Sequence, residues 1–292
     1  MTADQLLTAL FNAGIAISIV ATVLSLGLMF TVGQLVQPLR RVGLVVVVIV
    51  VNVVVLPALA WGIAAVLPID AAYVDGLVLA TLGAGTAAAL KAAQLAKGAD
   101  LALAVSLVVV LQLVNIVAVP VWAGQVVSGA SLSAWSIVQD LLLLVLIPLA
   151  VGLVARARYT EHAVEWQGGL VKVANLALVI ALASGITVNW DVIVDLFGSW
   201  VLVASVVIIA VGLLLGALLG ARDAETRTTT GLVTSMRFGS LGLIIIGTQL
   251  DGAADYLGPA IVFALLDFIL PVVVAIELGR RAAATGRPQP SV

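Results

Sequence analysis

The chain has 292 residues, of which 63% are hydrophobic and 10% are charged, and its formal net charge is −2. A soluble domain of this length does not need so much apolar surface, so the composition predicts an integral membrane protein and excludes a nucleic-acid-binding protein. The chain has no cysteine and one histidine, His162, which excludes disulfides and cysteine- or histidine-based metal sites. We therefore expect no metal and no cofactor.

Nine apolar stretches are each long enough to cross a bilayer. The hydrocarbon core of a bilayer is about 30 Å thick and requires roughly 20 apolar residues in a helix. In chain order the stretches cover about residues 7–35, 42–66, 73–96, 101–126, 134–156, 168–188, 199–221, 228–250 and 257–278. The sequence thus predicts one polytopic, all-α membrane domain over residues 1–292, with residues 279–292 as a tail.

The basic residues predict the orientation of these spans, because Lys and Arg are concentrated in cytoplasmic loops. The basic residues at span ends all fall on one side of the membrane: Arg40, Arg41, Lys97, Arg156, Arg158, Lys172, Arg222, Arg227, Arg280, Arg281 and Arg287. The loops on the other side contain acidic residues and no Lys or Arg: Asp70, Asp75, Asp191, Asp195, Asp251 and Asp255. We therefore expect a protein of the cell membrane with its N-terminus outside and its C-terminus, including the tail, in the cytoplasm.

Two of the 13 basic residues, Lys91 and Arg237, are not explained by this pattern. Arg237 lies about 15 Å from the cytoplasmic end of its span, near the bilayer centre, and Lys91 lies about 9 Å from its own end. A charge at such depth usually faces a bundle interior or an aqueous cavity. The alternatives are a Lys91 side chain that extends to the membrane surface and an Arg237 that forms a purely structural ion pair.

Two acidic residues also remain inside the predicted spans. Asp267 is near the middle of the last span, and Asp140 is about two turns into the fifth span, toward the outer face. Because neither charge tolerates lipid alone, we expect Arg237 and Asp267 to pair. Other polar residues occur singly within the spans, where they often form helix–helix hydrogen bonds: Asn52, Thr86, Gln94, Gln112, Asn115, Asn175, Thr234, Ser235 and Ser240.

The third and eighth spans combine glycines, hydroxyl residues and a charge, in TLGAGTAAALK (81–91) and TTTGLVTSMRFGSLGL (228–243). Glycine permits close backbone approach and local unwinding of a helix. Interrupted spans at corresponding places in two halves indicate a transporter site near the midplane of the membrane. The two spans run in opposite directions, as inverted repeats require, so we expect two discontinuous crossing helices.

The chain resembles the bile acid/sodium symporter family. The resemblance is carried by SLGLMFTVGQL (25–35), GAGTAAALKAAQLAKGADLALAVSL (83–107), LLLLVLIPLAVGLVARAR (141–158) and LGPAIVFALL (257–266), which follow the family's order. It implies a core domain and a panel domain, inverted repeats, two broken helices that cross at the site, and alternating access. The nine spans fit members that lack an additional N-terminal helix.

The chain departs from this family where the family binds sodium. The family's Ser-Asn pair is replaced by Ala88, Ala89, Leu90 and Lys91, its glutamate and Gln-Asn fall near Val233, Arg237 and Phe238, and hydroxyls of the following span are replaced near Val108 and Gln112. Sodium requires several hard oxygen ligands, preferably with a carboxylate. The resemblance thus implies lost sodium sites, with the charges of Lys91 and Arg237 in place of bound sodium.

We interpret the chain as a secondary transporter of a small organic anion and not as an enzyme. The candidate substrate contacts are Thr86, Lys91, Gln112, Asn115, Ser235, Arg237 and Ser240, and the candidates for coupling or gating are Asp267, Arg237 and Lys91. Proton coupling through Asp267 or Lys91 is an open alternative, as are sodium-coupled symport of a bile acid-like anion and a non-transporting receptor or structural protein. The sequence does not specify the substrate, the direction of transport or the oligomeric state.

Overall fold

A computed structural model describes residues 2–31, 33, 36, 40–127, 132–220 and 223–284. Within these ranges the regular structure is helical. Seven helical stretches are long and apolar enough to cross a membrane: Ala3–Met29, Val42–Val66, Leu101–Val126, Ala134–Arg158, Thr160–Val188, Trp200–Leu219 and Ala254–Ala284. The prediction of an all-α, multi-pass membrane protein is therefore confirmed. The orientation markers Arg222 and Arg287 and part of the end of the first predicted span lie outside the described residues.

The third and eighth predicted spans are both broken in the middle. The third consists of α5 (Ala71–Leu82) and α6 (Ala87–Leu95), and the eighth consists of α13 (Ala224–Ser235) and α14 (Gly239–Gln249). Each break falls in the glycine-containing stretch that predicted it. Gly85 in the first break has φ +74°, a conformation that residues with a side chain rarely adopt.

Two further spans contain a π-helical segment just before a proline. One runs α3 (Val42–Val50), η2 (Val51–Val55) and α4 (Leu56–Val66), and the other runs α8 (Ala134–Leu141), η3 (Leu142–Leu146) and α9 (Ile147–Arg158). Proline has no N–H to donate to the carbonyl group four residues earlier. For Pro57 that carbonyl belongs to Val53, and it accepts instead from Nε1 of Trp122 in α7 (Leu101–Val126) at 2.7 Å.

Some helices extend beyond the predicted spans. Helix α10 (Thr160–Val188) begins before the predicted residue 168, and α15 (Ala254–Ala284) continues into the predicted tail, whose residues from 285 onward lie outside the described ranges. A short helix, α11 (Trp190–Leu196), occupies a predicted loop before α12 (Trp200–Leu219). Polar residues mark where a chain leaves the apolar core of a membrane, and a helix can continue past that point.

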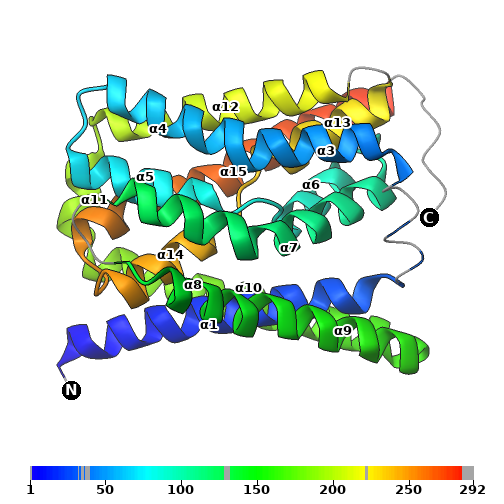
Figure 1. The fold of residues 1–292 in the computed structure, drawn as a ribbon, viewed down its shortest axis with the longest axis horizontal. Helices are drawn as coiled ribbons and strands as arrows, with labels where there is room; N and C mark the ends of the chain where they lie inside the picture. The colour runs from blue at the N-terminus through cyan, green and yellow to red at the C-terminus, as the bar shows by residue number, and fades with distance from the viewer. Residues whose placement is uncertain are drawn as a thin grey trace.

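The helices form two groups that lie side by side (Figure 1). The four-helix group consists of α1 (Ala3–Met29), α8, α9 and α10, with α1 packed most extensively against α10 and also against α9. The larger group contains the remaining helices. Gly27 of α1 and Gly152 of α9 permit a very close approach, since a Cβ on Gly27 would lie 2.6 Å from the Leu149 carbonyl oxygen.

Candidate functional site

The two breaks cross each other within the larger group. Ala84 of the first break and Arg237 of the second form an isolated antiparallel β-bridge. The N–H of Phe238 donates to the carbonyl oxygen of Gly83 at 2.9 Å. Backbone groups released from a helix inside a membrane need such partners, because lipid offers none. The crossing of two discontinuous helices, predicted from the sequence, is therefore present.

Two amide side chains of α7 hold the first break. Oδ1 of Asn115 accepts from the N–H of Ala84 at 3.1 Å, and Nδ2 of Asn115 donates to the carbonyl oxygen of Ala84 at 2.8 Å. Nε2 of Gln112 donates to the carbonyl oxygen of Gly85 at 2.7 Å. Both side chains are buried, and Oε1 of Gln112 has no hydrogen-bond partner in the described structure. The two predicted substrate contacts thus bind the backbone of the crossing directly.

The guanidinium group of Arg237 binds the C-terminal end of α5 and the π-helical segment η2. It donates to the carbonyl oxygens of Thr81 at 2.7 Å and Leu82 at 3.4 Å, and to Oδ1 and the carbonyl oxygen of Asn52, both at 2.9 Å. The last carbonyl groups of a helix lack intrahelical donors and carry a partial negative charge. Arg237 therefore serves as a cationic cap for α5, with 4% of its surface exposed.

The pairing of Arg237 with Asp267 differs from the predicted one. Oδ2 of Asp267, on α15, accepts from the main-chain N–H of Arg237 at 2.8 Å, whereas the guanidinium group binds Thr81, Leu82 and Asn52. The prediction of a side-chain ion pair is thus wrong. The guanidinium satisfies carbonyl groups that would otherwise lack donors, while the carboxyl group satisfies an N–H in the break.

Sequence reasoning missed the role of Asn52, which it placed among the scattered polar residues. Asn52 is fully buried, accepts twice from Arg237, and donates through Nδ2 to the carbonyl oxygen of Val48 at 2.9 Å and to Oγ1 of Thr234 at 3.2 Å. It connects the second span to the second broken helix through Arg237 and Thr234. The available signal was Pro57, five residues later, because a proline removes a donor from the preceding turn of a helix.

The other predicted site residues have different surroundings. Thr86 caps α6 by accepting from the N–H of Ala88 at 3.3 Å, and the hydroxyl of Ser235 donates to the carbonyl oxygen of Leu232 in its own helix at 3.1 Å. Ser240 is half-buried in the first turn of α14, and Lys91 is exposed on α6. The structure thus brings Arg237, Gln112 and Asn115 to the crossing, with Thr86 beside it, and places Lys91 further along α6.

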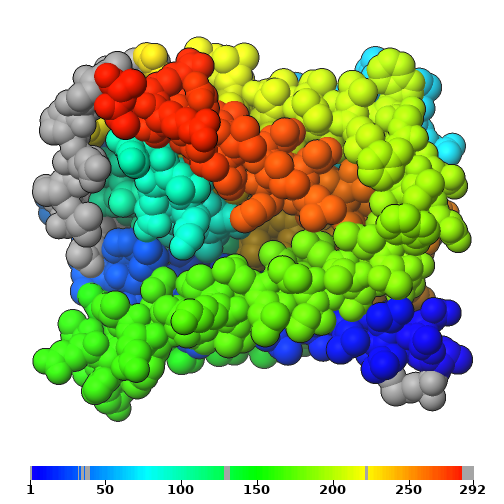
Figure 2. Space-filling model, turned by 180° about the vertical axis from the view of Figure 1, so that it is seen from behind, coloured from blue at the N-terminus to red at the C-terminus, as the bar shows by residue number. Residues whose placement is uncertain are grey.

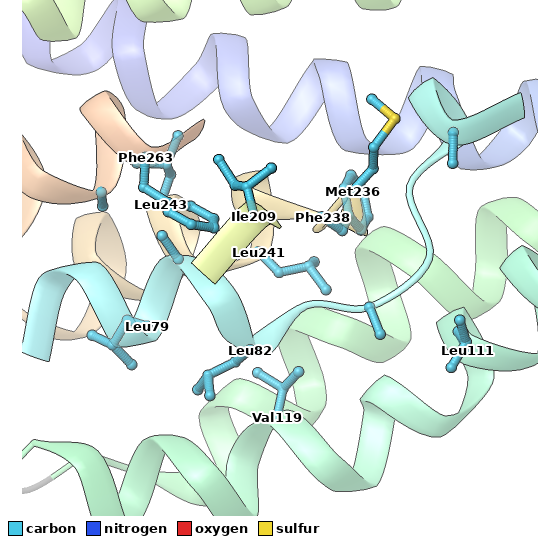
Figure 3. Close-up of a cluster of buried hydrophobic side chains, with 14 of the residues drawn as sticks. Leu79, Leu82, Leu111, Val119, Ile209, Met236, Phe238, Leu241, Leu243 and Phe263 are labelled. Carbon is cyan, nitrogen blue, oxygen red and sulfur yellow. The ribbon is translucent and has the colours of Figure 1, made fainter. Parts of the chain in front are cut away.

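The crossing is positive at two helix ends and apolar around its edge. Helices α6 and α14 both begin there, and the N-terminal end of a helix carries a partial positive charge that favours anions. Figure 3 shows apolar side chains around it, including Leu79 and Leu82 of α5 and Met236 and Phe238 of the second break. Charges act more strongly in such low-dielectric surroundings than in water.

A hollow lies beside the crossing helices. Figure 2 shows it between α15 and α6 of the larger group and α10 of the four-helix group, with more deeply placed atoms at its base. Lys91 belongs to the exposed face of α6, together with Gln94 and Leu95.

Two interrupted helices that meet inside a bundle of membrane-crossing helices are typical of multi-pass secondary transporters. Within this class, the family model described as the sodium bile acid symporter family matches residues 16–200, more than half of the chain. The chain belongs to this family. No curated protein sequence matches the chain. The matched region includes Lys91, Gln112 and Asn115, whereas Arg237 and Asp267 lie beyond it.

Proposed function

We propose that the protein transports a small organic anion across the membrane by alternating access, without sodium coupling. The observation that carries this proposal is the binding of Arg237 to four oxygen acceptors at the crossing, at 2.7, 2.9, 2.9 and 3.4 Å. Such a set of carbonyl and amide oxygens resembles the ligands that a hard cation prefers. Here a tethered guanidinium binds them and supplies a permanent positive charge.

The proposed anion site lies at the crossing and in the adjacent hollow. The N-terminal ends of α6 and α14 and the charge of Arg237 favour an anion there. Lys91, on the exposed face of α6, adds a second cation in this proposal, and Thr86 and Ser240 supply hydroxyl groups near the two helix starts. Gln112, Asn115 and Ser235 complete the set of proposed substrate contacts.

Alternating access requires two bodies that move against each other. In this proposal the four-helix group is the panel domain and the larger group is the core domain, which the family resemblance leads us to expect. The extensive packing of α1 on α10 and α9 supports the interpretation that the panel domain moves as one unit. The topology of nine spans, with the N-terminus outside, remains part of the proposal.

Transport of labelled organic anions into proteoliposomes tests this function. We expect bile acid-like or smaller carboxylate anions to be taken up at the same rate with an inward sodium gradient and with an equal potassium gradient. Strict dependence on sodium would contradict the proposal. It would support sodium-coupled symport. The supporting observations for that function are family membership and Oε1 of Gln112, which has no partner among the residues that the structure describes.

A non-transporting structural protein would also need Arg237 to hold the crossing. The variant Lys91→Gln separates the two functions, because Lys91 is exposed and its replacement leaves the crossing intact. We expect this variant to fold as the natural protein does and to transport anions more weakly. An absence of uptake by the natural protein for every anion tested, with intact folding, would favour the structural role.

A further inference from the structure

The two residues of the β-bridge are held by side chains at matching positions. Asn115 lies 31 residues after Ala84, and Asp267 lies 30 residues after Arg237. Asn115 belongs to the helix that follows the first broken span, and Asp267 belongs to the helix that follows the second. In both cases a side-chain oxygen accepts from the main-chain N–H of the bridge residue, at 3.1 Å and 2.8 Å. Asn115 and Asp267 are thus equivalent in the two halves.

The two side chains differ in one hydrogen bond. The amide of Asn115 both accepts from the N–H of Ala84 and donates to its carbonyl oxygen. Asp267 accepts from the N–H of Arg237 through Oδ2, but its Oδ1 is buried and has no partner among the described residues. An ionised carboxylate cannot donate a hydrogen bond, whereas a protonated carboxyl group can.

We propose that Asp267 is a proton-binding site, with the proton on Oδ1 donated to the main-chain carbonyl oxygen of Arg237. The equivalence with Asn115 places Oδ1 where Nδ2 of Asn115 donates to Ala84. A carboxylate in this position would direct lone pairs at a carbonyl oxygen and leave a buried oxygen without a donor, which is costly inside a protein. The proton removes both costs. It also gives Asp267 the same pair of hydrogen bonds to the main chain of Arg237 that Asn115 forms with Ala84.

The charge of Arg237 acts against a neutral Asp267, because a nearby positive charge favours the carboxylate. The guanidinium donors, however, are bound to Thr81, Leu82 and Asn52 and not to the carboxyl group. The helices packed against α15 are α5, α6 and α10–α14. Their titratable or charged residues are Tyr73, Asp75, Lys91, Glu161, His162, Glu165, Lys172, Asp191, Asp195, Glu225 and Arg227.

The proposal has a consequence for transport that rests on the proposed function. With Asp267 protonated, the charge of Arg237 is not balanced within the crossing, and an organic anion supplies the missing negative charge. With Asp267 ionised, the crossing is neutral and attracts an anion less. Binding of the anion and of the proton therefore favour each other, by the reciprocity of linked equilibria. The coupling ion would be a proton that enters with the anion.

Infrared spectroscopy of the full-length protein in lipid nanodiscs tests the proton site directly. We expect a carbonyl stretching band of a protonated carboxyl group at neutral pH that is absent from Asp267→Asn. Asp140→Asn is the matched control, because it removes a different carboxyl group, a half-buried one in a membrane-crossing helix, and leaves the Asp267 band in place. Spectra in which Asp267→Asn removes no such band would overturn the proposal.

Thermal unfolding distinguishes the proton from other occupants of Oδ1. The Asp267→Asn variant can form both hydrogen bonds to the main chain of Arg237 at any pH. We therefore expect its Tm to equal or exceed that of the natural protein and to stay constant as the pH is raised. The natural protein should lose Tm over the same rise, and Asp267→Ala should have a low Tm throughout. An Asn variant as unstable as the Ala variant would overturn the proposal. So would recovery of the natural protein at alkaline pH by sodium, which would make Oδ1 a cation ligand.

These measurements contain no transported anion. A failure of the proton site would therefore leave the proposed anion transport standing, and a failure to transport anions would leave the protonation of Asp267 standing.

Discussion

Arg237 and Asn52 are joined by two hydrogen bonds of 2.9 Å, one to the side-chain Oδ1 and one to the main-chain oxygen of Asn52. The planar guanidinium reaches both acceptors while it also binds the end of α5. This arrangement connects three segments that are far apart in the sequence. Its strength can be measured by changing either residue.

Replacement of Arg237 by Lys should destabilise the protein although it keeps the charge. An ammonium group cannot match the fork of a guanidinium, so at least one buried oxygen loses its donor, at a cost of about 1–3 kcal/mol. Arg237→Met should cost more, because all four acceptors lose their donor. Thermal unfolding in detergent or nanodiscs measures these effects, and the Tm should fall in the order natural protein, Arg237→Lys, Arg237→Met. A Met variant as stable as the natural protein would show that the network does not hold the crossing.

Asn52→Leu should lower stability by about 2 kcal/mol or more, because Arg237 and Thr234 both lose a buried partner. Thr234→Val is the matched control, since it removes one of the hydrogen bonds of Asn52, at 3.2 Å, and should cost about 1 kcal/mol. Combined with Arg237→Met in a double-mutant cycle, Asn52→Leu should give a large coupling energy and Thr234→Val a small one. Equal coupling energies would contradict the direct role of Asn52.

Gly85→Ala should destabilise the crossing for two reasons. The left-handed backbone, with φ +74°, costs a residue with a Cβ about 1–2 kcal/mol. The new Cβ would also lie 2.8 Å from that of Leu111. Gly124→Ala, in α7, is the control: a Cβ there meets nothing within 4 Å, so this change should be neutral or stabilise the helix by up to about 1 kcal/mol. A similar Tm change in both variants would argue against a strained turn at Gly85.

Lys91→Gln should leave the Tm within about 1 °C to 2 °C of the natural value, since surface substitutions usually change stability by less than 0.5 kcal/mol. If Lys91 attracts the anion, the KM for anion uptake should rise and should depend less on ionic strength. Lys97→Gln is the control, because Lys97 is also exposed but lies in the turn after α6. An identical KM in both variants would remove Lys91 from the substrate path.

The burial of Arg237 could be predicted from the sequence, but its partners could not. Charge counting shows which cations do not lie at the ends of spans, and glycine and hydroxyl residues indicate where a span is interrupted. The choice between Asp267 and the end of α5 depends on how two breaks meet in space. The carboxyl group and the guanidinium each bind main-chain groups at the break, and spacing along one chain does not reveal such contacts.

Helix boundaries show a similar limit. The predicted loop before residue 168 ends with TEHAVEWQ (160–167), which is polar enough to leave a membrane but also forms a good helix. Hydropathy therefore located the apolar part of α10 and missed its first turns. Lys91 illustrates another limit: its place in an apolar stretch does not reveal that it belongs to the exposed face of α6.

The hydrogen bonds at the crossing also limit how the protein can change shape. Interrupted helices often serve as hinges, because their φ and ψ angles are free to rotate. Here Asn115, Gln112, Asp267 and Arg237 bind the backbone of both breaks or the helix end beside them, so bending at the crossing would require several buried hydrogen bonds to break at once. A motion that preserves them must displace whole helices as rigid bodies. These hydrogen bonds all lie within the larger group, so a displacement of the two helix groups against each other would leave them intact.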